Sequence, residues 1–290
     1  VLQQKFVPSE IETVRREREL RLDQPFAVLM DQMFKAAYGN RDLGRLPIGD
    51  LNELKSIQMK ELNQFYRQWY APNNAVMVIT GKFDQAQVLQ RIEQNFGKIQ
   101  AHAVPAMAKV PLLDASKIQQ RQLSVQKGSD LAKVNMYLNG RDLKIQPVLA
   151  VAPYLYTLQP SGQLYKTMVE TGMTTTVQST TWLDQDFNVV FMGAIYAPTQ
   201  DAQQISKNLA QDIETPAHFN DADLNRVKSV FKNQADSIAT NAVALGNRLS
   251  DYVVSSQGHW EQYFNDVQAV QNLSTQQVNQ SLNTLDRKSV

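Results

Sequence analysis

Two neighbouring segments, residues 174–183 and 188–197, constrain the fold of this chain more than any other feature. The first alternates polar and apolar residues, the second is almost entirely apolar, and Asp-Gln-Asp-Phe separates them at 184–187. Alternation of this kind is typical of a half-buried strand in an antiparallel sheet. The two segments are therefore predicted to form an antiparallel pair. Two Asp residues could also hold a metal, but a hairpin turn is the more common use of Asp at such a place.

The rest of the second half has the pattern of an α+β unit. Residues 122–126 and 133–139 alternate like further antiparallel strands. Helical spacing of apolar residues predicts the helices around and after these strands. They cover 146–158, 162–170, 201–213, a long helix at 220–256, and 275–285.

The first half reads as helices followed by one buried strand. Apolar residues recur at helical spacing over 26–37, a short helix opens after Asp50, and a further one carries its apolar side chains within 62–69. The apolar run 75–81, Ala-Val-Met-Val-Ile-Thr-Gly, is predicted to be a buried strand. Asp84 can cap a helix that ends at Gly97.

The domain division follows from a loss of periodicity near 100–111, where Pro105 and Pro111 stand among small residues. We predict one domain at 1–100, a linker at 101–111 and a second domain at 112–290. A faint echo between 56–64 and 274–280 suggests two copies of one α+β unit, the first of them cut at its front.

Composition removes several classes of function. The 290 residues carry a net charge of +1, which gives no electrostatic reason to expect a nucleic acid partner. No apolar run approaches the length of a membrane span, so none is predicted. The chain has no cysteine, which excludes disulfides, thiolate metal ligands and cysteine nucleophiles.

A charged stretch near the start carries the candidate site. Ser9 with Glu12 has the spacing of a capping box, so a helix is predicted from Glu10 to the residue before Pro25. Glu10 and Glu17 are seven residues apart, almost two turns, and so project from one face. Taken alone, these residues also suit a solvated helix with ion pairs four residues apart.

Several motifs resemble those of zinc peptidases of the pitrilysin and insulinase family (M16), in particular bacterial members related to mitochondrial processing peptidase. They are Gly-Arg-Leu-Pro-Ile-Gly at 44–49, Phe-Tyr-Arg-Gln-Trp-Tyr-Ala-Pro-Asn-Asn at 65–74, the run at 75–81, Phe-Gly at 96–97, and Pro-Ser-Gly-Gln-Leu-Tyr-Lys-Thr-Met-Val-Glu-Thr-Gly at 160–172. The resemblance implies an α+β fold of two homologous domains. Each would be a mainly antiparallel sheet with helices on one face, and the first would be truncated at its N-terminus.

The resemblance also implies a zinc site that this chain holds only in part. In the family, Zn²⁺ is bound by a His-x-x-Glu-His helix and by a glutamate on a later helix. The later glutamate matches Glu17 as metal ligand, with Glu19 as the alternative, and the auxiliary catalytic carboxylate matches Glu10. The sequence has no His-x-x-Glu-His; its only histidines, in unrelated contexts, are His102, His218 and His259.

The predicted function is therefore part of a periplasmic or secreted zinc endopeptidase that hydrolyses peptides, inactive as this chain alone because two His ligands and the general base are missing. Val169 and Thr175 stand where active relatives carry an Arg and a Tyr that grip substrate, which weakens the catalytic interpretation. The alternative is a non-catalytic family member, acting as partner of a homologous active subunit or as a peptide-binding module. An unrelated α+β protein is the third possibility.

Overall fold

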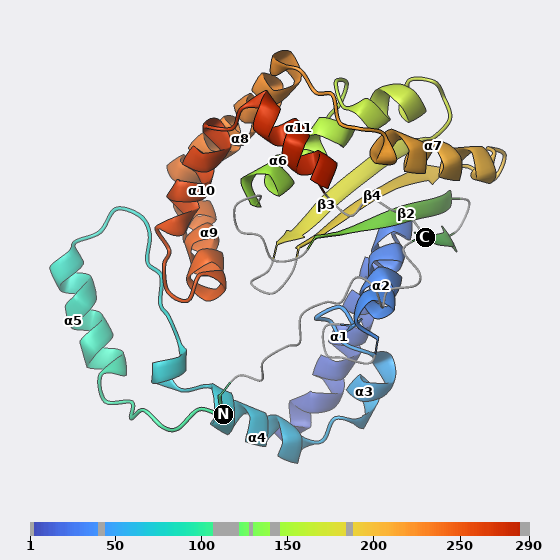
Figure 1. Cartoon of the computed structure of the whole chain (residues 1–290). Helices are drawn as coiled ribbons and strands as arrows, with labels where there is room; N and C mark the ends of the chain where they lie inside the picture. The colour runs from blue at the N-terminus through green and yellow to red at the C-terminus, as the bar shows by residue number, and fades with distance from the viewer. Residues whose placement is uncertain are drawn as a thin grey trace.

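A four-stranded antiparallel sheet forms the centre of the protein (Figure 1), in the strand order β1-β2-β4-β3. The strands are β1 (Gln122–Lys127), β2 (Asp130–Asn139), β3 (Thr176–Leu183) and β4 (Asn188–Tyr196). The structure is a computed structural model that describes residues 3–39, 44–106, 122–127, 130–139, 146–183 and 188–284.

The antiparallel pair predicted at 174–183 and 188–197 is confirmed. β3 and β4 run in register from Thr176 opposite Ile195 to Leu183 opposite Asn188. β4 also pairs with β2, from Leu131 opposite Tyr196, and β2 pairs with β1. The predicted turn at 184–187 lies outside the described residues. Alternation along the chain thus located all four strands of the described sheet.

The helices of the second half form a layer on one face of this sheet. α6 (Gln146–Thr157) packs across β3 and β4, with Val148, Leu149 and Val151 almost fully buried. A π-helical turn, η6 (Tyr165–Val169), follows it. The layer is completed by α7 (Ala202–Glu214), α8 (Asp221–Thr240), α9 (Ala242–Ser255), α10 (Gln262–Gln271) and α11 (Thr275–Thr284).

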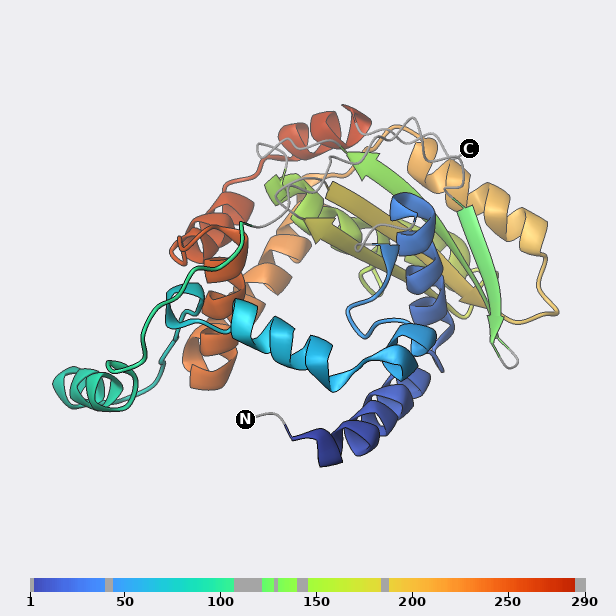
Figure 2. The same cartoon turned by 90° about the horizontal axis from the view of Figure 1, so that it is seen from below.

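The other face of the sheet is covered by a helix from the first half. α2 (Pro25–Tyr38) lies against β1 and β2 (Figure 2), with Leu29, Met33 and Phe34 buried there. The ring of Phe34 lies 5.9 Å from that of Phe191 on β4. Burying each of these side chains contributes roughly 1.5–3 kcal/mol. The expected α+β class is confirmed. α2, which lies in the segment predicted to belong to the first domain, packs on the sheet of the predicted second domain.

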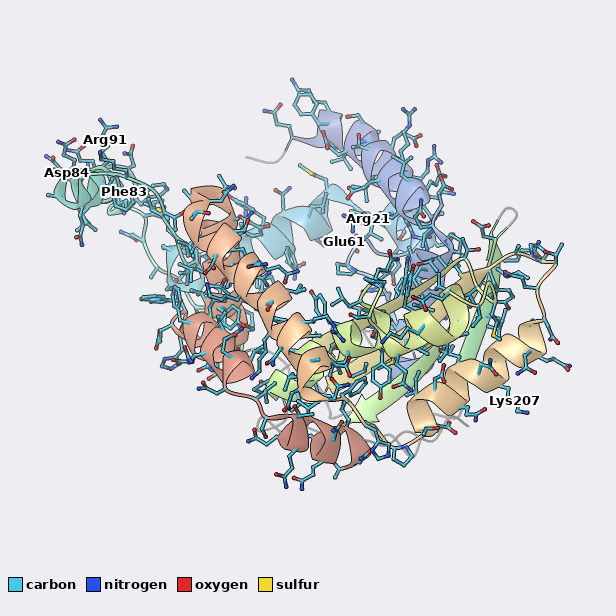
Figure 3. The ribbon with its side chains drawn as sticks, turned by 90° about the horizontal axis from the view of Figure 1, so that it is seen from above. Arg21, Glu61, Phe83, Asp84, Arg91 and Lys207 are labelled. Carbon is cyan, nitrogen blue, oxygen red and sulfur yellow. The ribbon has the colours of Figure 1, made fainter. Side chains whose placement is uncertain are left out.

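The remaining helices of the first half run in an arc that leads away from the sheet (Figure 1). They are α1 (Val7–Arg21), α3 (Leu51–Ser56), α4 (Met59–Trp69) and α5 (Gln85–Phe96), with short 3₁₀ turns at Gln4–Phe6 and Pro72–Asn74. α5 projects furthest, and Figure 3 shows Arg91 on it, with Phe83 and the N-cap residue Asp84 just before it. The predicted cap of α5 is confirmed, because the Asp84 carboxylate accepts from Gln87 N at 2.9 Å. No helix among the described residues has the length and apolar character that crossing a bilayer requires.

The strand predicted at 75–81 is wrong for this structure. The segment is extended, but Val76 and Met77 are 68% and 53% exposed, and no strand of the described residues pairs with it. A strand exists only where a neighbour supplies hydrogen bonds, which residue pattern alone does not guarantee. The segment instead touches the start of α9, where the Thr80 hydroxyl donates to the Ala242 carbonyl at 2.6 Å.

The single long helix predicted at 220–256 is also wrong. α8 and α9 are separate helices that meet at Asn241, whose φ of −113° and ψ of 110° are extended. The Asn241 side chain accepts from the backbone N–H of Ala244 at 3.0 Å and so caps α9. Asn favours such a cap over a helix interior because its side chain competes for backbone hydrogen bonds. The linker predicted at 101–111 is described only to 106 and is neither helix nor strand there.

A proline inside α6 leaves one helical carbonyl without its usual backbone donor, and a side chain of β3 donates to it instead. Pro153 has no N–H to donate to the carbonyl of Leu149, one turn earlier. The Thr181 hydroxyl on β3 donates to that carbonyl instead, at 3.0 Å. A strand side chain therefore replaces the missing helical bond and fixes α6 on the sheet.

Thr181→Val is predicted to lower the free energy of unfolding by about 1–2 kcal/mol, because the Leu149 carbonyl loses its donor. Chemical denaturation of the whole chain measures the change. Thr180→Val is the matched control, since the neighbouring Thr180 is exposed and a branched side chain is kept. An equal loss in both variants would show that the hydroxyl of Thr181 does not stabilise α6.

Asp212 on α7 is a half-buried acid. The Thr167 hydroxyl of η6 donates to its carboxylate, yet burial dominates and raises the pKa of Asp212. A raised pKa in the folded state means that the stabilising contribution is fully present below the unfolded value, near pH 4, and is lost as pH rises through the folded value.

Asp212→Asn is therefore predicted to gain stability relative to the natural protein as pH is raised from about 4 to 7, since the amide cannot ionise. Urea denaturation at several pH values follows the difference. The control is Glu93→Gln on the exposed surface of α5. A difference for Asp212→Asn that shrinks on going to pH 7 would contradict the direction of the pKa shift.

Candidate functional site

The candidate carboxylates stand on α1, a helix with no buried residue. It begins at Val7, with Pro8 in its first turn, and not at Glu10 as predicted. The predicted capping box is wrong, because the Ser9 hydroxyl donates back to the carbonyl of Phe6 at 2.8 Å. Proline fits the first turn of a helix, where its missing N–H costs nothing, so the helix extends one turn earlier.

Glu10 and Glu17 are both exposed on α1. The seven-residue spacing places them on one face of the helix. Glu17 accepts a hydrogen bond from Arg21 at 2.6 Å, and the Glu17 side chain remains 48% exposed. Glu10 makes no side-chain contact with another described residue that would hold it in place.

The opposite face of α1 carries a separate network of ion pairs. Arg15 pairs with Glu12 and Glu19, and Arg16 lies 3.4 Å from Glu12. The hydrogen bond from Arg15 lowers the pKa of Glu12 to about 2. Glu19 is nine residues from Glu10, which is about half a turn around the helix. Glu17, and not Glu19, therefore shares a face with Glu10.

One long-range hydrogen bond holds α1 to the turn before α3. Arg18 Nε donates to the Gly49 carbonyl at 3.1 Å. Gly49 has a φ of +79°, a conformation in which a side chain would be strained. Asp50 follows as the cap of α3, accepting from Asn52 N at 2.8 Å, and this bond lowers its pKa.

The three histidines do not join these carboxylates. His259 lies 3.1 Å from Glu261, and the backbone of His102 bonds to Asn73. Within the described residues, no three His, Asp or Glu side chains come close enough to hold a metal ion. A catalytic zinc requires three protein ligands, so the described donor set does not by itself fit zinc.

Val169 and Thr175 lie beside the sheet, far along the chain from α1. Val169 ends the π-helical turn and packs against the core, and Thr175 is exposed with its N–H donating to Ile195 O at 2.8 Å. Neither side chain is a strong hydrogen-bond donor to a peptide carbonyl in the way that Arg would be. Apolar spacing predicts an ordinary α-helix at 162–170, whereas the structure has a π-helical turn at 165–169.

The sequence match and the fold both point to a known class of protein. Residues 56–231, well over half of the chain, match the family described as "Peptidase M16 inactive domain". The chain therefore belongs to the M16 peptidase family, as its motifs indicated.

Individual relatives agree with this assignment. The chain is 30% identical over 97 residues to "Probable zinc protease PqqL" of Haemophilus influenzae, which is 32% of this chain and 10% of the relative. It is 27% identical over 92 residues to "Zinc protease PqqE" of Helicobacter pylori, 31% of this chain and 20% of the relative. The matches thus span a fifth or less of the length of these two relatives.

Solved structures show the same fold at low sequence identity. A protease from Helicobacter pylori superposes with a TM-score of 0.82 at 17% identity, covering 100% of this chain and 71% of that one. A peptidase M16 inactive domain from Pseudomonas fluorescens gives 0.78 at 14% identity, covering 99% and 69%. The likeness extends over both halves of the chain.

Arg18→Gln is predicted to raise hydrogen exchange in α1 about fivefold, which corresponds to the ~1 kcal/mol typical of one hydrogen bond. Mass spectrometry of peptides from 7–21 measures it. Arg16→Gln is the control, because Arg16 is exposed and its ion pair within the described residues is with Glu12 of the same helix. Unchanged exchange in Arg18→Gln would mean that the Gly49 contact does not hold the helix.

Proposed function

We propose that this chain is part of a zinc-dependent endopeptidase that hydrolyses peptides. Membership of the M16 family and the relatives named as zinc proteases support this class of activity. The observation that carries the proposal is the pair of exposed carboxylates, Glu10 and Glu17, on one face of α1. Without buried neighbours, both remain accessible to partners outside the described residues.

Glu17 would supply one of the three protein ligands that a catalytic zinc requires. Zinc, when bound, lowers the pKa of a coordinated water to about 7 and so makes hydroxide available near neutral pH. Arg21 would orient Glu17, since it already donates to that carboxylate. Glu10, almost two helical turns away on the same face, would hold a proton or a polar group beside the site. Two histidines and a general base must come from outside this chain, so the chain alone is inactive.

We also propose that residues 1–100 are the rear part of a first domain, with 101–111 as linker and 112–290 as the second domain. The exposed apolar segment 75–81 supports this arrangement. An extended segment with apolar side chains and an open backbone is suited to pair with further strands. Substrate would bind in extended form by pairing with a sheet edge.

The second candidate is a non-catalytic family member that binds peptides or partners a homologous active subunit. Val169 and Thr175 favour it, because neither can donate the charged or phenolic hydrogen bonds that stabilise a developing oxyanion. The matching family description, "Peptidase M16 inactive domain", also favours it. A periplasmic or secreted location is proposed for either candidate. The likeness to "the periplasmic protease PqqL from Escherichia coli" supports it, and the absence of cysteine is compatible with it.

The zinc content of the full-length product of the gene tests the proposal. Elemental analysis is predicted to find about one zinc per chain, and Glu17→Gln to lose it, since three protein ligands are required. Glu19→Gln is the matched control and keeps its zinc, because Glu19 faces Arg15 on the other side of α1. A protein that binds no zinc would refute the hydrolase and favour the non-catalytic candidate.

A further inference from the structure

A groove of about 1020 Å³ lies among α6, α8, α9 and α10. Figure 1 shows these helices grouped together on the helical layer, and α1 on a different part of the molecule. The volume is that of a site for a drug-sized ligand or a short peptide segment. No motif pointed to it, because its lining comes from four helices between residues 146 and 270.

Four aromatic rings contribute to the groove's lining. Tyr154 and Phe231 stand edge to face with their centroids 5.0 Å apart. Tyr252 and Tyr263 do the same at 5.5 Å. The ring faces carry negative electrostatic potential, which attracts cations.

A half-buried carboxylate, Asp266, lies beside one of these rings, that of Tyr252. Asp266 accepts from the Tyr252 hydroxyl at 2.9 Å and from Gln262 Nε2 at 2.6 Å. Both donors are neutral, and no basic residue of the described chain forms an ion pair with Asp266. A carboxylate removed from water without a counter-charge is unfavourable. The groove therefore contains a half-buried carboxylate whose two described hydrogen-bond donors are both neutral.

The other charges of the lining do not reverse this preference. Arg248 and Asp251 both lie on the exposed surface of α9. With Asp266, the groove holds two carboxylates and one guanidinium. Exposed charges are screened by water and salt, whereas a half-buried one is screened less. The described lining thus has one more carboxylate than guanidinium, so its net charge is negative even with Arg248 close to Tyr252 and Tyr263.

We propose that this groove binds a basic side chain of a polypeptide, with its guanidinium or ammonium group beside Asp266 and its stem against the aromatic rings. Carboxylate pairing and contact with aromatic faces both favour a cation at this place. That the ligand is a polypeptide rests on the proposed function; the preference for a cation does not. The binding requires neither zinc nor peptide cleavage.

Calorimetry on the whole 290-residue chain tests the proposal with two peptides, N-acetyl-Phe-Arg-Phe-amide and N-acetyl-Phe-Glu-Phe-amide. The arginine peptide is predicted to bind at least about tenfold more tightly than the glutamate peptide, as a change of 1.4 kcal/mol would give. Asp266→Asn should weaken the arginine peptide by a similar factor. Asp236→Asn is the matched control, because Asp236 lies on α8 outside the lining and pairs with Lys232.

A second variant keeps the test decisive even if Asp266→Asn does not fold. Arg248→Gln removes the one guanidinium of the described lining and is therefore predicted to bind the arginine peptide more tightly than the natural chain. Unchanged or weaker binding in Arg248→Gln, equal binding of the two peptides, tighter binding of the glutamate peptide, or no binding of either would each overturn the proposal. The zinc content of the full-length protein has no influence on these outcomes.

Discussion

The packing of α2 on the sheet is the contact on which the rest of the structure depends. Phe34 meets Phe191 from one side of β4, while Val190 and Met192 face the α6 layer on the other side. A sheet with one face uncovered would expose its apolar side chains to water. By covering the β1 and β2 side of that face, α2 joins the N-terminal helices to the sheet.

The candidate site has the opposite character, because it is held by few contacts. α1 buries no side chain. Its described hydrogen bond to a residue distant in sequence runs from Arg18 to the Gly49 carbonyl. Exposed ion pairs such as Arg21 with Glu17 contribute little to stability. A helix held in this way leaves Glu10 and Glu17 exposed on its surface, which the proposed role of Glu17 as a metal ligand requires.

Features that depend on local periodicity, such as strands and helix faces, could be predicted from the sequence. Features that depend on contacts with other segments of the folded chain could not. Alternation located β3 and β4 to within two residues, and the spacing of Glu10 and Glu17 placed them on one face. The segment 75–81 has the residues of a strand but no described neighbour to pair with. Asn241 breaks a helix that apolar spacing continues, because its side chain caps the next helix. The groove around Asp266 could not be predicted, since its residues meet only in the folded chain.

The most direct test of this account is a double-mutant cycle between α2 and β4, using Phe34→Leu, Phe191→Leu and the double variant. Each free energy of unfolding is measured by chemical denaturation of the whole chain. An aromatic pair in contact is predicted to give a coupling energy of about 0.5–1.5 kcal/mol. Strict additivity of the two substitutions would contradict the packing of α2 on the sheet, and with it the joining of the two halves through one core.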